Sequence, residues 1–383
     1  MAGDDPYAGA PASDTTEPWD FECQGIDVSA NQGSYDWDAA LGAGIRFAFA
    51  RLSLGQGTED KQFASNWAAM AARKDRIARG AYHFAYPSSV AAGKTPSQDA
   101  VDEANYFCDR LIFHEQQVHG GTPMADGTTL PPVLDYEQTS DNSKLTLSSA
   151  QQKDWINSWI RTVQDRLGRG VLLYSGPNVW RKDFNADPWL SELPLWVAQY
   201  TSPSHRKSDP WSRWCFWQWS GGGSGDMYQK HYGANFPGSG GHAVDVSVFW
   251  GSADQLRELC DPSKDRWLNA DGSIGAKSAL DSSSSETRTT TTASPSLAPP
   301  PPPSVDISTL AGSYSPIVAR VQGLLLSQGY GPSGLVGHGG APDGLYGSKS
   351  ASALSQFKAS VGLPADTLVD WPTWWALVTK GLS

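Results

Sequence analysis

Short apolar runs of the strand type recur along the first two thirds of the chain and are separated by polar stretches. Apolar residues at helical spacing fill the earlier gaps, for example at Phe63, Trp67 and Met70, whereas the later gaps are rich in Gly, Pro, Ser and Asp and are typical of loops. Strands that alternate with helices predict an α/β fold with a TIM-like barrel, irregular in its last third. The eight predicted strands cover residues 25–29, 46–53, 79–86, 131–136, 171–175, 195–200, 214–220 and 243–249.

Two further helices are predicted in the early gaps. One covers residues 104–111, where apolar residues return every three or four positions. The other begins after Ser148, because Ser148 and Gln151 have the spacing of a capping box and tryptophans then repeat at helical spacing.

The composition divides the chain into four parts. Residues 1–22, rich in Asp, Pro, Ala and Thr, are predicted to form a disordered N-terminal arm, and residues 23–262 hold the barrel pattern. Residues 263–304 are a Ser/Thr/Pro-rich linker that cannot bury enough apolar surface to fold, and its proline run favours an extended conformation. Residues 305–383 contain three amphipathic stretches and predict a second, small three-helix domain.

Charge and composition exclude several classes of function. The chain of 383 residues has a formal net charge of −11 and no basic cluster, which argues against a nucleic-acid binder. No apolar run reaches the roughly 18 residues of a membrane span. The 17 tryptophans and 13 tyrosines are many for this length, and such rings suit the apolar faces of sugars as well as protein cores.

The cysteine pattern supports neither a zinc site nor a redox motif, because no C-x-x-C spacing occurs. Free buried thiols are expected, although the two cysteines that flank the barrel would approach each other if its ends meet. The four cysteines are Cys23, Cys108, Cys215 and Cys260.

Two carboxylates, Asp135 and Glu137, follow the apolar run of the fourth predicted strand. Because side chains alternate along a strand, positions i and i+2 share a face, with Cβ atoms about 6–7 Å apart. That spacing suits the paired carboxyl groups of glycosidases, in which crowding separates the pKa values so that one group stays protonated while the other ionises. A solvated strand end is the alternative explanation.

Two more aspartates strengthen the catalytic interpretation. Asp27 and Asp245 each lie within a short apolar run, where a charge is costly unless it is paired or used, although a turn or capping role would also explain either residue. In a closed barrel the first and last strands are neighbours, so Asp27 is expected beside Asp245. Asp135 and Glu137 are then expected across the mouth, and four acids at one rim predict catalysis.

Several motifs occur along residues 23–260 in an order that resembles one family. They are Gly25-Ile26-Asp27-Val28-Ser29, Gly80-Ala81-Tyr82-His83-Phe84, Leu134-Asp135-Tyr136-Glu137, Leu195-Trp196-Val197-Ala198-Gln199-Tyr200, Trp217-Gln218-Trp219-Ser220 and Val244-Asp245-Val246. The family they resemble is the glycoside hydrolase family 25 muramidases, the Chalaropsis-type lysozymes. The resemblance implies an irregular (β/α)5(β)3 barrel and cleavage of the β-1,4 bond between N-acetylmuramic acid and N-acetylglucosamine in peptidoglycan.

The resemblance also implies roles for the site residues. Glu137 matches the general acid, which protonates the leaving oxygen. Asp135 matches the ionised partner, which stabilises the positively charged transition state or orients the acetamido group for substrate-assisted attack. Asp27 and Asp245 match supporting acids that hold charge and hydrogen bonds around this pair. The aromatic residues expected along the sugar cleft are Tyr82, Tyr174, Trp196 and Tyr200.

Three other features receive a structural interpretation. His83 is expected to be a buried, hydrogen-bonded residue rather than a base. The stretch 114–129 departs from the family and is expected to be a surface loop, because no carboxylate or Cys accompanies His114 and His119 at metal-ligand spacing. The glycines of 221–225 are expected to form a flexible loop beside the cleft, since neither Lys nor a helix start follows as in a phosphate cradle.

A second set of motifs lies in the C-terminal part and resembles the helical, repeat-like peptidoglycan-binding domain. This resemblance implies that residues 305–383 bind the wall. The motifs are Val321-Gln322-Gly323-Leu324-Leu325, Asp343-Gly344-Leu345-Tyr346-Gly347, Ala353-Leu354-Ser355-Gln356-Phe357, Gly362-Leu363-Pro364 and Thr373-Trp374-Trp375-Ala376-Leu377.

The function predicted from these features is that of an endolysin-type muramidase of phage origin that lyses bacteria. After Met1 there is neither a basic nor an apolar targeting region, so a soluble protein without a signal peptide is expected, which accumulates in the host bacterial cytoplasm and reaches the wall after holin-type release. Bacterial peptidoglycan is the expected partner of a monomer. No cofactor, metal, nucleic acid or membrane insertion is expected.

Three alternatives were weighed against this function. A chitinase of glycoside hydrolase family 18 would need a D-x-x-D-x-D-x-E run, which is absent. A non-catalytic barrel lectin that binds peptidoglycan or chitin would typically have lost the acid, yet Glu137 is present. A wall amidase or peptidase would need a zinc or thiol site, and the sequence has neither signature.

Overall fold

The structure is a computed structural model with two compact units, Met1–Thr289 and Thr290–Ser383, each of which is described by itself. The described residues are 5–87, 93–119, 124, 126–137, 147–269, 271–277, 305–306, 308, 316–330, 345–369, 373 and 376–377. None of the helices in these segments combines the length and the apolar character needed to cross a bilayer.

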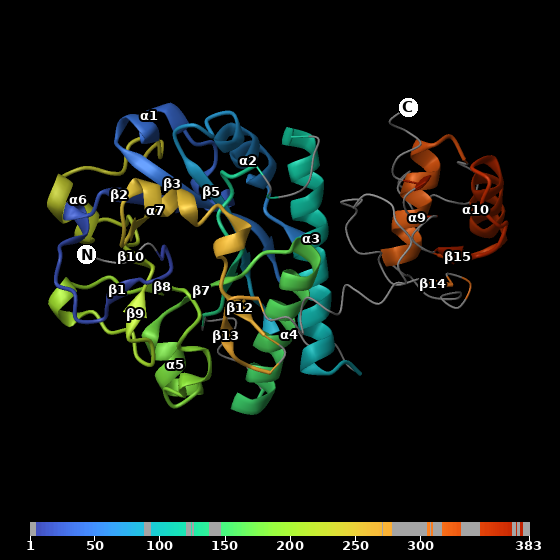
Figure 1. The fold of residues 1–383 in the computed structure, drawn as a ribbon. Helices are drawn as coiled ribbons and strands as arrows, with labels where there is room; N and C mark the ends of the chain where they lie inside the picture. Colours follow the sequence, from blue (N-terminus) through green and yellow to red (C-terminus); the bar gives the residue numbers. More distant parts are fainter. Residues whose placement is uncertain are drawn as a thin grey trace. The chain divides into compact units, whose positions relative to one another are not determined.

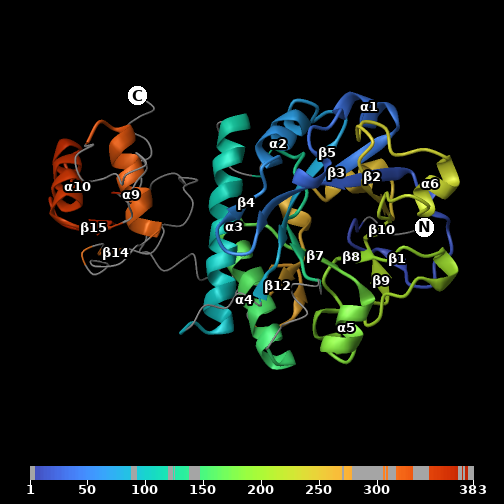
Figure 2. The same cartoon turned by 180° about the vertical axis from the view of Figure 1, so that it is seen from behind.

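A closed barrel of eight strands forms the centre of the first unit (Figures 1 and 2). Neighbouring strands are parallel except at β11, which runs antiparallel to both β10 and β2. Every predicted strand is present, so the predicted α/β barrel is confirmed. In order around the barrel the strands are β2 (Cys23–Val28), β3 (Ile45–Leu54), β5 (Ala78–Phe84), β6 (Val133–Asp135), β7 (Leu172–Ser175), β8 (Leu195–Ala198), β10 (Phe216–Ser220) and β11 (Asp245–Phe249).

Five helices alternate with the first six barrel strands, which gives the expected five β/α units followed by three strands. α3 and α4 lie side by side on one face of the barrel (Figures 1 and 2). The predicted cap of α4 is also present, because Ser148 and Gln151 form a capping box. The five helices are α1 (Trp37–Gly42), α2 (Phe63–Ala71), α3 (Pro96–His119), α4 (Ser149–Leu167) and α5 (Pro177–Asp183).

The last third of the barrel contains short helices as well as loops, so the prediction of loops alone is wrong. α6 (Met227–Tyr232) and α7 (Ala253–Glu258) have only 6 residues each, too few for a helical apolar period to be visible in the sequence. The remaining short elements of this unit are β4 (Thr58–Glu59), β12 (Trp267–Leu268), β13 (Ile274–Gly275) and the 3₁₀ helices η1 (Pro18–Asp20), η2 (Ala30–Gln32), η5 (Pro188–Leu190), η6 (Pro203–His205) and η7 (Pro262–Lys264).

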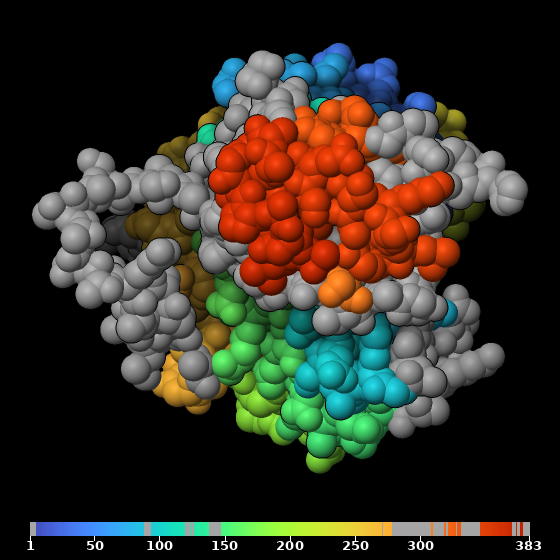
Figure 3. Space-filling model, turned by 90° about the vertical axis from the view of Figure 1, so that its right-hand side faces the viewer, coloured from blue at the N-terminus to red at the C-terminus, as the bar shows by residue number. Residues whose placement is uncertain are grey.

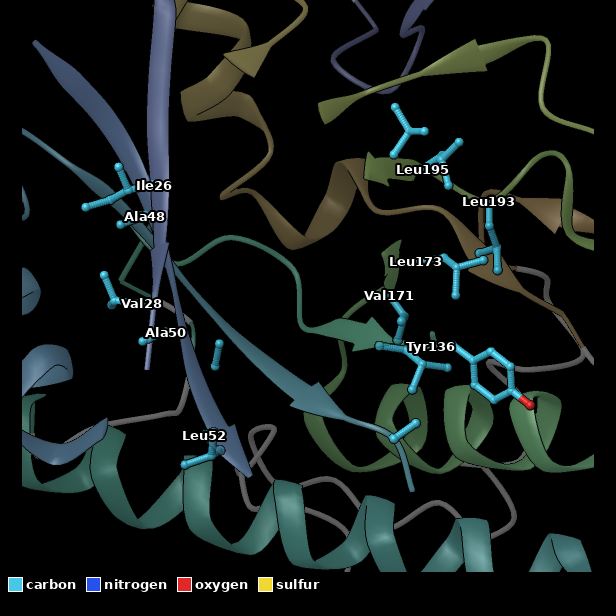
Figure 4. Close-up of a cluster of buried hydrophobic side chains, with 14 of the residues drawn as sticks. Ile26, Val28, Ala48, Ala50, Leu52, Tyr136, Val171, Leu173, Leu193 and Leu195 are labelled. Atoms are coloured by element: carbon cyan, nitrogen blue, oxygen red, sulfur yellow. The ribbon is translucent and has the colours of Figure 1, made fainter. Parts of the chain in front are cut away.

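Two apolar clusters lie on the two sides of the barrel wall. On β3, Phe47 and Phe49 belong to the cluster inside the barrel, whereas Ala48 and Ala50 belong to the cluster between strands and helices. This alternation is the period of two that a strand requires. Figure 4 shows part of the outer cluster, with Ala48 and Ala50 among its labelled residues.

The inner aromatic rings require two glycines on the neighbouring strands. A Cβ atom at Gly25 would lie 2.3 Å from the ring of Phe47, and one at Gly80 would lie 2.2 Å from the ring of Phe49. Any larger residue at these positions would displace a ring that fills the barrel below the site. The glycines of the two strand motifs therefore serve close packing.

The N-terminal arm folds against the barrel, so the prediction that residues 1–22 are disordered is wrong for its described part. β1 (Ala10–Pro11) pairs with β9 (Arg213–Trp214). Tyr7 is buried, and its hydroxyl donates to Asp265 Oδ1 at 2.8 Å. Asp265 in turn pairs with the buried Arg169 at 2.7 Å. The anchor could not be predicted from the sequence, because the arm is polar in composition and because Tyr7 and Asp265 are 258 positions apart.

The stretch 114–129 is also not a simple surface loop, because α3 continues through its first residues. Glu115 on this helix is buried and accepts hydrogen bonds from Trp67 Nε1 at 2.8 Å and from Arg79 Nη2 at 3.0 Å. It also accepts from the backbone N–H of Met124 at 3.0 Å. The buried Arg79 guanidinium requires an anionic partner, and the extended helix supplies it.

The four cysteines are buried and free, as the sequence predicts. Three of them, Cys23, Cys215 and Cys260, belong to the cluster inside the barrel. Burial raises the pKa of each of these thiols to about 12, so they behave as small apolar residues.

The second unit has a small apolar core of its own, formed mainly by α9 (Pro316–Ser327) and α10 (Ser348–Ser360). Figure 1 labels both helices, and Figure 3 shows the surface of this unit in orange and red. β14 (Val305–Asp306) pairs with β15 (Leu368–Val369) beside these helices. The prediction that residues 263–304 form a linker is wrong for its described part, in which β12 pairs with β13 and Asp265, Trp267 and Leu268 are buried. Residues 278–304 and most of the third predicted helix lie outside the described residues. The core residues are Val318, Val321, Leu325, Ala353, Leu354, Phe357, Val369 and Leu377.

Substitutions at Tyr7 test the anchoring of the arm. Tyr7→Phe keeps the ring and loses the hydrogen bond to Asp265, which we expect to lower the free energy of unfolding by about 1 kcal/mol. Tyr7→Ala also loses the buried ring, and the expected loss is about 3–5 kcal/mol. Urea unfolding followed by tryptophan fluorescence measures both, and an alanine variant as stable as the wild type would refute the anchor.

Candidate active site

A cavity of about 240 Å³ lies at the carboxyl ends of the parallel barrel strands, where sites of such barrels form. β11 contributes its first residue instead of its last, because it runs in the opposite direction. The cavity brings together every site residue predicted from the sequence. These residues are Asp27, Asp135, Glu137, Asp245, Tyr82, Tyr174, Trp196 and Tyr200.

Asp135 and Glu137 form a hydrogen-bonded pair at the end of β6. Asp135 is 5% exposed, and its Oδ1 atom is buried with no hydrogen-bond partner in the described part of the chain. Two carboxyl groups share a hydrogen bond only when one of them carries a proton. The pair therefore holds at least one proton in this arrangement and keeps one acceptor atom free.

Asp27 and Asp245 lie opposite each other on β2 and β11, as expected for the first and last strands of a closed barrel. The strand register pairs the two residues directly. Asp27 Oδ2 accepts a hydrogen bond from Gln218 Nε2 at 2.8 Å. The backbone pairing fixes the separation of the two acids, and the amide of Gln218 orients one of them.

Burial raises the pKa of all four acids, because it removes water from the charged form. Like charges raise these values further, from Asp245 toward Asp27 and from Glu137 toward Asp135. The pKa of Asp245 is raised to about 7. The cluster consequently keeps protons near neutral pH that isolated carboxyl groups would release, which is the condition for acid catalysis.

Aromatic side chains form one wall of the cavity. The rings of Tyr174 and Trp196 meet edge to face with their centroids 4.7 Å apart, and Trp196 Nε1 donates to Ser247 Oγ at 3.1 Å. Tyr200 is 55% exposed at the rim, whereas Tyr82 is buried. Rings fixed in this way offer rigid, amphipathic surfaces to a sugar.

Five polar residues of the cavity, Ser29, Asn31, Gln32, Arg51 and Gln218, were not predicted from the sequence, and the last two contact the acids or shift their pKa values. Gln218 is 2% exposed and forms hydrogen bonds within the site, and Arg51 on β3 pairs with Asp60 at 2.8 Å. The Arg51 guanidinium acts against the rise in the pKa of Asp135. The sequence signal for Arg51 and Gln218 was a long polar side chain within an otherwise apolar strand, β3 for the first and β10 for the second.

His83 is buried and hydrogen-bonded outside the cavity, as predicted. Its Nδ1 atom lies 2.8 Å from Ser53 Oγ, and its Nε2 atom lies 2.8 Å from Glu103 Oε2. The imidazole also stacks on Trp159, with ring centroids 5.4 Å apart. His83 therefore joins β5 to β3 and α3 on the helix side of the barrel wall.

The glycine loop after β10 lies beside the cavity, as expected. A Cβ atom at Gly221 would lie 3.4 Å from the ring of Tyr200. Gly222 has a φ of +66°, and a Cβ atom there would lie 2.2 Å from Val244 O. Close backbone approach, rather than flexibility, explains why glycine stands at position 222.

The two histidines of the 114–129 stretch form no metal centre in the described structure. His114 Nε2 lies 2.7 Å from Glu59 Oε1, and the side chain of His119 is outside the described residues. Where the chain is described, no group of three or more His, Cys, Asp or Glu side chains could hold a metal ion.

Residues 26–226 match the family model described as Glycosyl hydrolases family 25. The chain is 31% identical to Lysozyme M1 of Streptomyces globisporus over 216 residues, which are 55% of this chain and 67% of that protein. It is 29% identical to the N,O-diacetylmuramidase of Chalaropsis sp over 199 residues, which are 51% of this chain and 86% of that protein. Among solved structures it is similar to the bacterial lysozyme of Streptomyces coelicolor, with 30% identity, a TM-score of 0.50, and coverage of 65% of this chain and 99% of that one.

Asp245→Asn should stabilise the fold, and more so as the pH rises. In the unfolded chain the carboxyl ionises with its ordinary pKa of 3.8, whereas in the folded chain it holds its proton to about pH 7. Between these two pH values the folded wild type binds a proton that the unfolded chain has released, so its free energy of unfolding falls as the pH rises. The amide of Asp245→Asn has no proton to release in this range, so the variant does not show this fall. We expect its advantage in the free energy of unfolding to grow by about 4 kcal/mol between pH 4 and pH 8.

Urea unfolding at a series of pH values measures this difference. Asp75→Asn, at an exposed aspartate outside the cavity, is the matched control and should show no such trend. A difference between Asp245→Asn and wild type that stays constant with pH would contradict the assigned protonation.

Proposed function

This chain belongs to the glycosyl hydrolases family 25 and is a glycoside hydrolase of the lysozyme type, and we propose that it cleaves the β-1,4 bond between N-acetylmuramic acid and N-acetylglucosamine in bacterial peptidoglycan. The observation that carries the proposal is the hydrogen-bonded pair of Asp135 and Glu137 in a cavity that also holds Asp27 and Asp245. Such a pair combines a carboxylic acid with a carboxylate, the two groups that glycoside hydrolysis requires.

Glu137 is the general acid in this proposal, and Asp135 is its ionised partner. The free Oδ1 atom of Asp135 is suited to accept the N–H of the sugar acetamido group. A hydrogen bond from the substrate favours the ionised form of Asp135 and leaves the shared proton on Glu137. Glu137 then protonates the leaving glycosidic oxygen, while the oriented acetamido oxygen attacks the anomeric carbon and the glycosidic bond breaks. Water next attacks the anomeric carbon and gives a proton to Glu137, which breaks the bond to the acetamido oxygen and restores the acid.

The other cavity residues support this step. Asp27 and Asp245 hold carboxyl oxygens, which accept hydrogen bonds, near the positive charge that develops on the sugar. The aromatic residues Tyr82, Tyr174, Trp196 and Tyr200 bind the faces of the sugar rings.

We propose that the second unit holds the enzyme on its insoluble substrate. This unit has a separate apolar core, and a Ser/Thr/Pro-rich segment joins it to the barrel. Independent cores joined by a linker allow one part to bind while the other acts, and tethering raises the local concentration of the barrel at the wall. A bacteriolytic role follows from this arrangement, and the endolysin and phage context stays a prediction.

Glu137→Gln should abolish cleavage while leaving folding intact, because an amide cannot donate the proton. General acid catalysis typically contributes ~10²–10⁴-fold, so we expect a loss of at least about 100-fold in kcat. Mass spectrometry of fragments released from purified walls provides the readout. The wild type should create new reducing ends at muramic acid.

Glu192→Gln, at an exposed glutamate outside the cavity, is the control and should release the wild-type fragments. Free stem peptides in place of reducing sugars would show that the protein cuts a different bond. Turnover by Glu137→Gln at the wild-type rate would remove Glu137 from the mechanism.

Removal of residues 278–383, a cut that keeps Asp265 and the β12–β13 pair on the barrel, should reduce activity on intact walls far more than activity on short soluble glycans. The barrel keeps its complete cavity, so soluble substrates should be cleaved at rates within about twofold of the wild type, whereas the loss of tethering should slow wall lysis by about 10-fold or more. Turbidity of purified walls and chromatography of soluble fragments measure the two rates. Equal losses on both substrates would indicate a structural role for the second unit.

A further inference from the structure

Gln218 fixes the direction of the hydrogen bonds along one wall of the cavity. Its Nε2 atom donates to Asp27 Oδ2 at 2.8 Å. Its Oε1 atom accepts from the hydroxyl groups of Tyr174 at 2.9 Å and Tyr200 at 2.8 Å. In this orientation the amide nitrogen donates to Asp27 and the amide oxygen accepts from both hydroxyl groups, so every polar atom of Gln218 has a partner.

Both tyrosine protons are used inside this cluster. Burial and the nearby acids raise the pKa of Tyr174 and of Tyr200, which keeps both hydroxyl groups protonated. A hydroxyl group has one proton and two acceptor lone pairs. Since each proton points toward the amide of Gln218, only lone pairs remain for a ligand in the cavity.

The same amide also affects the pKa of Asp27. A donor at Asp27 Oδ2 favours the carboxylate over the acid, in opposition to burial and to the charge of Asp245. Gln218 lies on β10, next to the strand that carries Asp245, and it is almost completely buried. Its position is therefore fixed by the barrel rather than by a ligand.

We propose that Gln218 is a positioning residue that makes the two tyrosine hydroxyl groups of this wall accept but not donate hydrogen bonds, and that these groups select a sugar face carrying hydroxyl or acetamide N–H donors. This inference rests on the proposed function and adds to it the chemical character of the ligand face. Gln218 itself acts through Tyr174, Tyr200 and Asp27, and it does not touch the bond that breaks.

Gln218→Met tests the proposal, because methionine keeps the length of the side chain and removes its donor and acceptor. The tyrosine hydroxyl groups are then free to turn their protons into the cavity, and Asp27 stays protonated to higher pH. On soluble wall glycans we expect KM to rise about 10-fold and the acid limb of the kcat/KM profile to move up by about one pH unit.

The matched control is Gln152→Met, at another buried glutamine that accepts a tyrosine hydroxyl. Gln152 Oε1 accepts from Tyr136 at 2.7 Å, and Gln152 does not line the cavity. The control should lose stability but keep the wild-type KM and pH profile. If both variants lose stability and neither changes KM or the pH profile, Gln218 only packs and the proposal is overturned.

Two further measurements test the role of Gln218 even if the Gln218→Met variant folds poorly. Gln218→Glu retains the acceptor but opposes Asp27 with a second carboxylate, so it should move the acid limb in the same direction even if the methionine variant folds poorly. Unfolding of the Gln218→Met and Gln152→Met variants between pH 3 and pH 9 needs no substrate, and only the former should extend the pH range over which stability falls. A wild type that cleaves no glycan would refute the proposed function, whereas an unchanged pH range would refute the role of Gln218.

Discussion

The antiparallel pairing of β11 with β2 is the constraint on which the active site depends. A parallel last strand would present its carboxyl end, Phe249, at the mouth of the barrel, whereas the reversed strand presents Asp245. The same pairing places Asp245 directly opposite Asp27 and next to the strand of Gln218. Backbone hydrogen bonds therefore bring two carboxyl groups together that would separate in solution.

Confinement of four acids is costly, and the lower part of the barrel offsets that cost. Below the cavity, Phe47 and Phe49 fill the interior against the backbone of Gly25 and Gly80. Rigid aromatic packing prevents the strands from spreading to relieve the repulsion above it. Burial above this packed base is what allows the acids to keep protons near neutral pH.

The sequence was sufficient to predict the features that depend on the alternation of residues over a short segment. Strands and the Asp135 and Glu137 pair follow from alternation over a few residues, and closure of the barrel then places Asp27 beside Asp245. Features that depend on distant partners were not predictable. The arm at Tyr7 is polar in composition, and its anchor lies at the other end of the unit. Gln218 was visible as a polar residue in an apolar strand, but its role required the positions of three other side chains.

The anchoring of Tyr7 to Asp265 has a consequence for the synthesis of the protein. Strand β2 leaves the ribosome before its partner β11, and Tyr7 is 258 positions ahead of its anchor Asp265. Until they emerge, the inner edge of β2 and the arm before it lack their final partners, and unpaired strand edges favour association between nascent chains. The barrel therefore completes its fold only after residue 265 has left the ribosome.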